Sequence, residues 1–153
     1  MFRLARIPGL DRRAAGTVED RADPSLLLIT RDAELNRRVA EIAASWNWSV
    51  RLQPEPTRQA APAGDSGTHQ IVIFDRDSTD RDWREALAIL KQEYRDACLL
   101  LASRVSDSYL VREVVRLGGY DVLATSGDDD RLRRALRFAW FWKRNFRRRD
   151  GFA

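Results

Sequence analysis

Asp75 is the residue whose type and position best fit a chemical role in this sequence. It directly follows the apolar run 71–74, whose composition is typical of a strand buried on both faces, as in a parallel sheet. Binding and reaction sites of open parallel sheets lie outside the carboxyl ends of the strands. A carboxylate at that edge can serve as an acid, a base, a nucleophile or a metal ligand. Whether Asp75 does so depends on the residues that share the edge.

Three further strand-like runs, 26–29, 98–101 and 121–125, bring the residues at or just after their carboxyl ends around Asp75. These neighbours are Thr30, Arg31, Asp32, Ala102, Ser103, Thr125 and Ser126. Asp32 is the one acid among them, and a shift of one residue would bring it inward. We interpret Asp77 as a turn or cap residue of the following helix. The edge therefore lacks the charged partners that chemistry on Asp75 would require.

The rest of the sequence does not indicate an enzyme. His69 is the only histidine and precedes the strand 71–74, which places it at the opposite end of the sheet. No metal-ligand cluster, glycine-rich phosphate loop or nucleophile elbow is present. Cys98 is the single cysteine and lies in an apolar run, typical of a buried structural residue. We expect no enzymatic activity, no metal and no cofactor.

Strand-like runs alternate with amphipathic helical segments from Ser25 onward. The predicted strands are 26–29, 48–52, 71–74, 98–101 and 121–125, and the predicted helices are 32–46, 81–96, 106–117 and 128 to about 145. Right-handed crossovers then place helices on both faces of a parallel sheet. We predict an α/β, flavodoxin-like, five-stranded parallel sheet in the order 2-1-3-4-5.

Two segments should depart from a regular version of this fold. Prolines and glycines between Gln53 and Gln70 limit the second helix to one or two turns, so it is shortened or replaced by a loop. The final helix is extended. We divide the chain into a flexible N-terminal tail (1–24), one domain (25–145) and a basic C-terminal tail (146–153). Without a secretory signal or an apolar stretch that could span a bilayer, the sequence predicts a soluble, cytoplasmic protein.

Between about Ser25 and Asn145 the chain resembles the response-regulator receiver domains of two-component signalling, the CheY-like superfamily. The resemblance rests on the runs 26–35, 71–75, 99–103 and 117–123. It implies that Asp75 occupies the phosphoacceptor position. The family's acidic Mg²⁺-binding pair falls on Thr30 and Arg31, its hydroxyl on Ala102 with Ser103 adjacent, its Lys-Pro on Thr125-Ser126, and its aromatic switch on Val122.

These replacements predict a degenerate receiver, or pseudo-receiver. Phosphoryl transfer to a carboxylate concentrates negative charge, which a metal and a lysine must neutralise. We therefore expect no productive phosphorylation of Asp75. One hypothesis is that the Arg31 guanidinium replaces the metal and pairs with Asp75. The alternative is that Arg31 points to solvent and Asp75 hydrogen-bonds its own loop.

The final helix carries more large apolar side chains than one sheet can bury. Leu132, Leu136 and Ala139 form the stripe expected to dock, which leaves as an interface Arg137, Phe138, Trp140, Phe141, Trp142 and Arg144. The resemblance implies a homodimer or a partner site here. Alternatively, these aromatics cover the N-terminal tail or the gap beside the second helix.

The sequence thus predicts a stand-alone, phosphorylation-independent signalling or adaptor module that acts through protein–protein contacts. A histidine kinase or another signalling protein is the expected partner, together with a second copy in a homodimer. Less favoured are a nucleic-acid-binding or membrane-surface role for the basic aromatic end, 140–149, and a true phosphoacceptor with a rearranged site.

Overall fold

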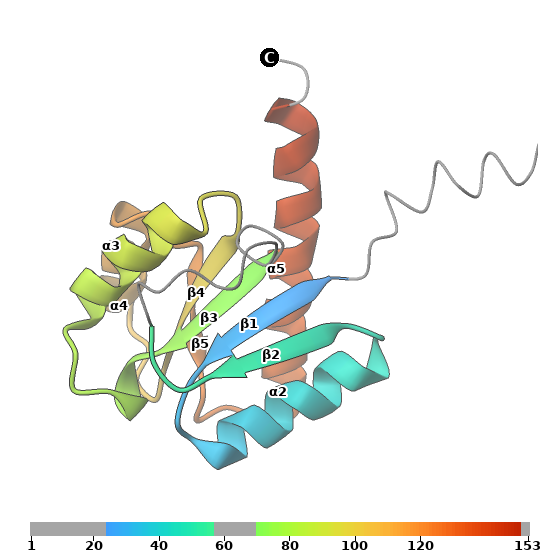
Figure 1. Cartoon of the computed structure of the whole chain (residues 1–153), viewed down its shortest axis with the longest axis horizontal. Helices are drawn as coiled ribbons and strands as arrows, with labels where there is room; N and C mark the ends of the chain where they lie inside the picture. The colour runs from blue at the N-terminus through green and yellow to red at the C-terminus, as the bar shows by residue number, and fades with distance from the viewer. Residues whose placement is uncertain (1–23, 57–69, 151–153) are drawn as a thin grey trace, which may run out of the picture.

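The computed structural model describes residues 24–56 and 70–150 of the 153-residue chain. Five parallel strands form one sheet in the order β2-β1-β3-β4-β5 (Figure 1). Their bounds are β1 Ser25–Ile29, β2 Ser49–Gln53, β3 Ile71–Asp75, β4 Cys98–Ser103 and β5 Asp121–Ala124. The predicted flavodoxin-like topology is confirmed.

Helices cover both faces of this sheet. One face carries α2 (Ala33–Ser45) and α5 (Asp129–Asp150), and the other carries α3 (Trp83–Glu93) and α4 (Ser108–Arg116). A short 3-10 helix, η2 (Arg76–Ser78), follows β3. No helix among the described residues is both long and apolar enough to cross a bilayer.

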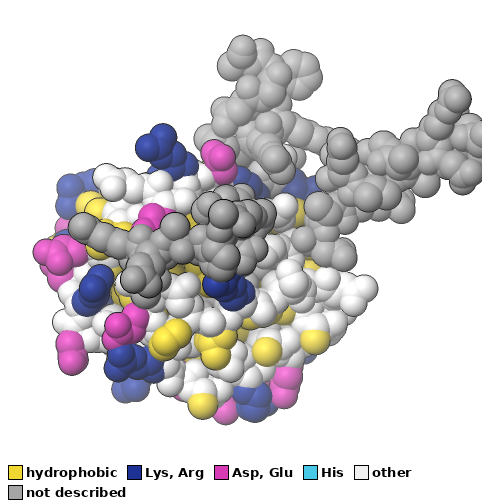
Figure 2. Space-filling model, in the orientation of Figure 1, with side chains coloured by type: hydrophobic (Ala, Val, Ile, Leu, Met, Phe, Trp, Pro, Cys, Tyr) yellow, Lys and Arg dark blue, Asp and Glu magenta, His cyan; other side chains and the backbone are white. Residues whose placement is uncertain are grey.

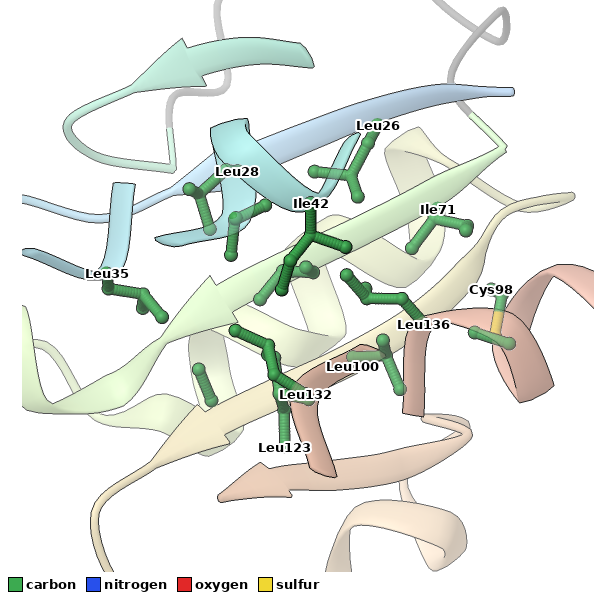
Figure 3. Close-up of a cluster of buried hydrophobic side chains, with 14 residues drawn as sticks. Leu26, Leu28, Leu35, Ile42, Ile71, Cys98, Leu100, Leu123, Leu132 and Leu136 are labelled. Carbon is green, nitrogen blue, oxygen red and sulfur yellow. The ribbon is translucent and has the colours of Figure 1, made fainter. Parts of the chain in front are cut away.

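Alternation along the strands divides the core into two layers, because successive side chains of a strand point to opposite faces. In β1, Leu26 and Leu28 face α2 and α5, whereas Leu27 and Ile29 face α3 and α4. Figure 3 shows the first layer, in which Leu132 and Leu136 of α5 meet strand residues such as Leu100. The uninterrupted apolar runs of the sequence are therefore strands buried on both faces.

Aspartates begin each helix at the edge where the strands end. Asp32, Asp82 and Asp107 are the N-caps of α2, α3 and α4, and each accepts a hydrogen bond from a main-chain N–H of the first turn. Asp128 does the same for α5, accepting from the N–H of Arg131 at 2.9 Å. The acids of this edge are thus largely engaged in starting helices.

The end of α4 requires glycine. Gly118 has φ +98°, a left-handed conformation that side chains with a Cβ rarely adopt. A Cβ on Gly119 would lie 2.5 Å from Val114 Cγ1. The predicted stop of this helix at Gly118-Gly119 is confirmed.

The extended final helix is confirmed and is longer than expected. α5 has 22 residues and continues to Asp150, beyond the predicted end near Asn145, so the backbone of 146–150 is helical. Figure 1 shows its last turns standing beyond the end of the sheet. The N-terminal tail and the shortened second helix fall on 1–23 and 57–69, outside the described residues.

Candidate functional site

Asp75 is the last residue of β3 and is buried, with 3% of its surface exposed. The Thr30 hydroxyl donates a hydrogen bond to Asp75 Oδ2 at 2.7 Å, and Thr30 is equally buried. The main-chain N–H of Asp77 donates to Asp75 Oδ1 at 3.0 Å. Both carboxylate oxygens therefore have donors from the chain itself.

Thr30 links Asp75 to the start of α2. Its Oγ1 accepts a hydrogen bond from the N–H of Asp32 at 2.9 Å while its hydroxyl hydrogen points to Asp75. The Asp32 carboxylate turns the other way, because it accepts from the N–H groups of Glu34 and Leu35 as the cap of α2. Asp32 therefore does not join Asp75 in a pair of acids.

The hypothesis that Arg31 pairs with Asp75 is wrong. The guanidinium of Arg31 bonds to the carboxylate of Glu55, and both side chains are about half exposed. Thr30, which has a short side chain and directly follows β1, lies beside Asp75 instead. Arg31 follows it on the surface, where charge is hydrated at little cost.

The residues after β4 and β5 lie at the same edge but use their polar groups elsewhere. Ala102 pairs with Asp75 in the β3–β4 register and is buried. Ser103 Oγ donates to the carbonyl of Val105 at 2.6 Å, which closes its own turn. The Ser126 hydroxyl donates to the carbonyl of Arg104 at 3.0 Å. Within the described contacts, the structure brings Thr30 and Ala102 to Asp75, but not Ser103 or Ser126.

Arg38 of α2 holds the loop between β5 and α5. Its guanidinium donates to the carbonyls of Thr125 at 2.7 Å and Gly127 at 2.8 Å, and to Asp129 Oδ1 at 2.9 Å. The Arg38 side chain is only 13% exposed. The hydrogen bond from Arg38 lowers the pKa of Asp129 below its ordinary value. The partly buried Arg38 thus holds the segment that contains Thr125 and Ser126.

Two further hydrogen bonds join neighbouring loops at this edge. Asp77 lies in the short helical turn η2, in line with the turn role expected of it, and its Oδ2 accepts a hydrogen bond from the N–H of Arg104, after β4, at 2.6 Å. The N–H of Arg31, after β1, donates to Ser78 Oγ at 3.1 Å. With the contacts of Arg38 and Ser126, these bonds connect the loops after β1, β3, β4 and β5 around Asp75.

Comparisons with solved structures identify the fold. The chain is similar to the signal receiver domain of an HD domain-containing protein from Pseudomonas fluorescens Pf-5, with TM-score 0.64, 19% identity, and coverage of 80% of this chain and 98% of that one. A response regulator from Thermotoga maritima matches with TM-score 0.61, 13% identity, and coverage of 76% and 97%. The fold is that of response-regulator receiver domains.

A pilus assembly protein from Burkholderia thailandensis E264 shows the same fold, with TM-score 0.62, 21% identity, and coverage of 76% of this chain and 97% of that one. No protein-family model matches the sequence, and no curated protein matches it.

The pocket of this receiver fold does not fit Mg²⁺. Magnesium is usually held through one or two carboxylates and keeps several waters. Here the Asp75 oxygens bond to Thr30 and the N–H of Asp77, while Asp32 caps α2. The described residues contain no group of three or more His, Cys, Asp or Glu side chains that could hold a metal ion. The polar groups of the pocket satisfy one another instead.

The sequence interpretation missed Arg38, and little in the sequence could have revealed it. Two of its three acceptors are main-chain carbonyls, which any residue would supply. They are also 87 and 89 positions away along the chain. Only the sheet order, which places α2 and α5 on the same face, brings them together.

The predicted interface residues of α5 divide into two groups. Phe138 and Phe141 are 59% and 66% exposed. Trp140 and Trp142 are partly buried and pack against the core layer beneath α5. Trp140 contacts Trp48 beside β2, and Trp142 contacts Tyr120 just before β5, with ring centroids 6.1 and 5.1 Å apart. The two tryptophans thus anchor α5 to both edges of the sheet.

The two arginines of that predicted interface lie over tryptophan rings. Arg137 Cζ is 5.1 Å from the ring centroid of Trp46, and Arg144 Cζ is 5.9 Å from that of Trp140. Trp46 in turn packs on Trp48, with centroids 4.9 Å apart. Such cation–π contacts orient a guanidinium while leaving its N–H groups in solvent. Both arginines remain exposed.

Cys98 is a core residue. It is fully buried in the layer beneath α5, and burial raises the pKa of its thiol to about 12. Since the thiolate is the reactive form, Cys98 is unreactive near neutral pH.

Proposed function

We propose that this chain is a signalling module of receiver fold that acts through protein–protein contacts and without phosphorylation of Asp75. The observation that carries the proposal is the pair of hydrogen bonds that Asp75 accepts from Thr30 and from the N–H of Asp77. Asp75 is only 3% exposed, and attack on a phosphoryl donor through either oxygen would disturb the hydrogen bond that this oxygen accepts. Of the described cations at this edge, Arg31 bonds to Glu55 and Arg38 to the β5–α5 loop, so neither is placed to neutralise the added charge.

The pocket then serves as a structural centre for the loops around it. A module of this kind would signal by its presence and its contacts, with no enzymatic activity of its own. The expected location is the cytoplasm, where a histidine kinase or another signalling protein would be the partner.

The test is incubation of the chain with a small acyl phosphate and Mg²⁺, followed by intact-mass measurement. We expect no mass increase, whereas a phosphorylatable receiver domain treated in parallel should gain one phosphoryl group. A variant with the family's residues restored, Thr30→Asp, Arg31→Asp, Ala102→Thr and Thr125→Lys, probes whether these positions are what prevents the reaction. A phosphoryl adduct on Asp75 of the unmodified chain would overturn the proposal.

The contact surface that we propose lies on the side of α5 that faces β5. Phe138 precedes Trp142 by one helical turn, and Trp142 contacts Tyr120 beside β5, so Phe138 lies on the same side. On α4, Val115 is 53% exposed and lies two residues after Glu113, whose carboxylate pairs with Arg84 of α3. Residues two apart on a helix face opposite ways, so Val115 also points toward the β5 side.

Homodimer formation through this surface is tested by light scattering of the unmodified chain and of Phe138→Ala. Trp142→Ala is less suitable, because Trp142 packs against the core. We expect the unmodified chain to have the mass of a dimer and Phe138→Ala that of a monomer. A monomeric unmodified chain would exclude the homodimer and leave contact with another protein as the mode of action.

A further inference from the structure

The side of α5 that faces away from the sheet combines basic and apolar groups. Its exposed residues between 131 and 145 include Arg134, Arg137, Phe141 and Arg144. These positions follow one another at helical spacing, so they form one stripe along the outside of α5, which we call the outer stripe. Phe141 is 66% exposed at its centre.

Charge on this helix differs sharply from charge elsewhere. Residues 131–149 contain nine of the chain's 27 basic residues and none of its 23 acidic ones, so the rest of the chain carries more acids than bases. On the face seen in Figure 2, basic and acidic side chains are interspersed. The formal net charge of +4 thus conceals a strongly basic helix on an acidic remainder.

The arginines of the outer stripe differ in their contacts from Arg133 of the same helix. Among the described residues, no carboxylate forms an ion pair with Arg134, Arg137 or Arg144, whereas Arg133 pairs with Asp130 at 3.6 Å. Arg137 and Arg144 are already oriented by Trp46 and Trp140. Orienting them before binding reduces the entropy that a partner's carboxylates must overcome.

A second copy of α5 is a poor match for this stripe. The three acids at the start of α5 are engaged: Asp128 caps the helix, Asp129 bonds to Arg38, and Asp130 pairs with Arg133. Two outer stripes placed together would therefore bring arginine against arginine, and like charges in an interface oppose association.

We propose that the outer stripe of α5 binds an acidic amphipathic segment of another protein, an inference that rests on the proposed function. Carboxylates of that segment would accept hydrogen bonds from Arg134, Arg137 and Arg144, for which the planar guanidinium is well suited. Apolar side chains between them would cover Phe141. The combination favours protein over a nucleic acid duplex, which supplies the negative charge but no apolar groups for the phenylalanine.

The test measures binding of a labelled, helix-forming peptide whose leucine stripe is flanked by glutamates, by fluorescence anisotropy. We expect saturable binding that weakens with added salt. Arg134→Glu and Phe141→Ala should each weaken it at least about tenfold, because each removes one component of the recognition. Arg81→Glu, the same charge change on the opposite side of the sheet, and Tyr109→Ala, an exposed aromatic on α4, are the matched controls and should leave binding unchanged.

Three results would overturn the inference. One is the absence of peptide binding at millimolar concentration. The second is tighter binding of an oligonucleotide or of anionic phospholipid vesicles, weakened by the same two substitutions. The third is a dimer of the unmodified chain that Phe141→Ala dissociates, which would make a second copy the occupant.

Failure of this inference and failure of the proposed function give different results. A chain that gains no phosphoryl group and also binds no peptide retains the proposed function and loses the acidic partner. A chain that becomes phosphorylated on Asp75 and binds the peptide retains the acidic partner and loses the phosphorylation-independent mode. Circular dichroism of each variant confirms that the compared proteins are folded.

Discussion

The edge of the sheet around Asp75 and the outer stripe of α5 differ in how their charged and polar groups are satisfied. At the edge, charged and polar groups are buried, and partners from neighbouring loops satisfy them: Thr30 and the N–H of Asp77 for Asp75, and two carbonyls and Asp129 for Arg38. On the outer stripe, three arginines and a phenylalanine are exposed, and none of these arginines forms an ion pair with a carboxylate of the described residues. The first arrangement stabilises the fold, and the second is available to another molecule.

The comparison shows that the position of a residue in a fold does not by itself determine its chemical role. Asp75 stands at the carboxyl end of β3, the edge where parallel sheets place their sites, yet each of its carboxylate oxygens already accepts a hydrogen bond from the chain. A buried polar group that lacks a hydrogen-bond partner lowers the stability of the fold. The polar groups of a buried pocket that binds no ion are therefore expected to hydrogen-bond to one another. If this comparison is right, substitutions at the edge should lower the free energy of unfolding, whereas substitutions on the outer stripe should not.

The inner side of α5 should give the largest effect. Leu136 is fully buried in the layer beneath the helix, so Leu136→Ala should lower the free energy of unfolding by about 2–5 kcal/mol. Urea denaturation measures it. A loss below about 1 kcal/mol would mean that α5 is not anchored as the structure has it.

The Thr30–Asp75 hydrogen bond should contribute less. Thr30→Val keeps the shape but removes the donor to Asp75 Oδ2 and the acceptor of the Asp32 N–H, at a cost of about 1–3 kcal/mol in unfolding free energy. Thr30→Ser retains the hydroxyl and is the control. Equal stability of the Val variant and the unmodified chain would show that the pocket does not depend on this bond.

Arg38 should matter mainly to the β5–α5 loop. Arg38→Met keeps much of the aliphatic stem and removes three hydrogen bonds, which should cost about 1–3 kcal/mol and speed amide hydrogen exchange in 125–128. Arg37→Met is the matched control, because the partners of Arg37, Glu34 and Glu41, are exposed and screened by solvent. Exchange that is equally fast in both variants would contradict a specific role for Arg38.

The Arg38–Asp129 pair should also give a pH dependence. The pKa of Asp129 is lower in the folded chain than its ordinary value of 3.8, so the stabilisation is fully present above that pH and is lost as the pH falls through the lowered value. Unfolding of the unmodified chain and of Asp129→Asn, compared from about pH 6 to about pH 2, should show a stability difference that shrinks at the acid end. A difference that grew on acidification would have the wrong sign.

The smallest effect on stability belongs to the outer stripe. Phe141→Ala removes a side chain that is 66% exposed, and we expect the free energy of unfolding to change by no more than about 0.5 kcal/mol. Thermal unfolding beside Leu136→Ala provides the contrast. A loss comparable to that of Leu136→Ala would show that Phe141 is covered by the chain itself and is not a contact residue.

Two classes of feature could be predicted from the sequence because they depend on local patterns. Uninterrupted apolar runs such as 71–74 indicated strands buried on both faces, and helical spacing of Leu132, Leu136 and Ala139 indicated the docking side of α5. The alternation of these elements indicated a parallel sheet with helices on both faces, and five strands fitted the flavodoxin-like order. The position of Asp75 at the end of β3 followed directly.

Tertiary structure alone decided which arginine is buried and which tryptophans are anchors. Arg31 and Arg38 are chemically identical, but Arg38 faces the carbonyls of a loop about 90 positions away and Arg31 faces Glu55 at the surface. Trp140 and Trp142 were expected in the interface with Phe138 and Phe141, yet they pack against Trp48 and Tyr120. The sequence determines the faces of each element, whereas the partners of a side chain depend on which distant main-chain and ring atoms the completed sheet brings beside it.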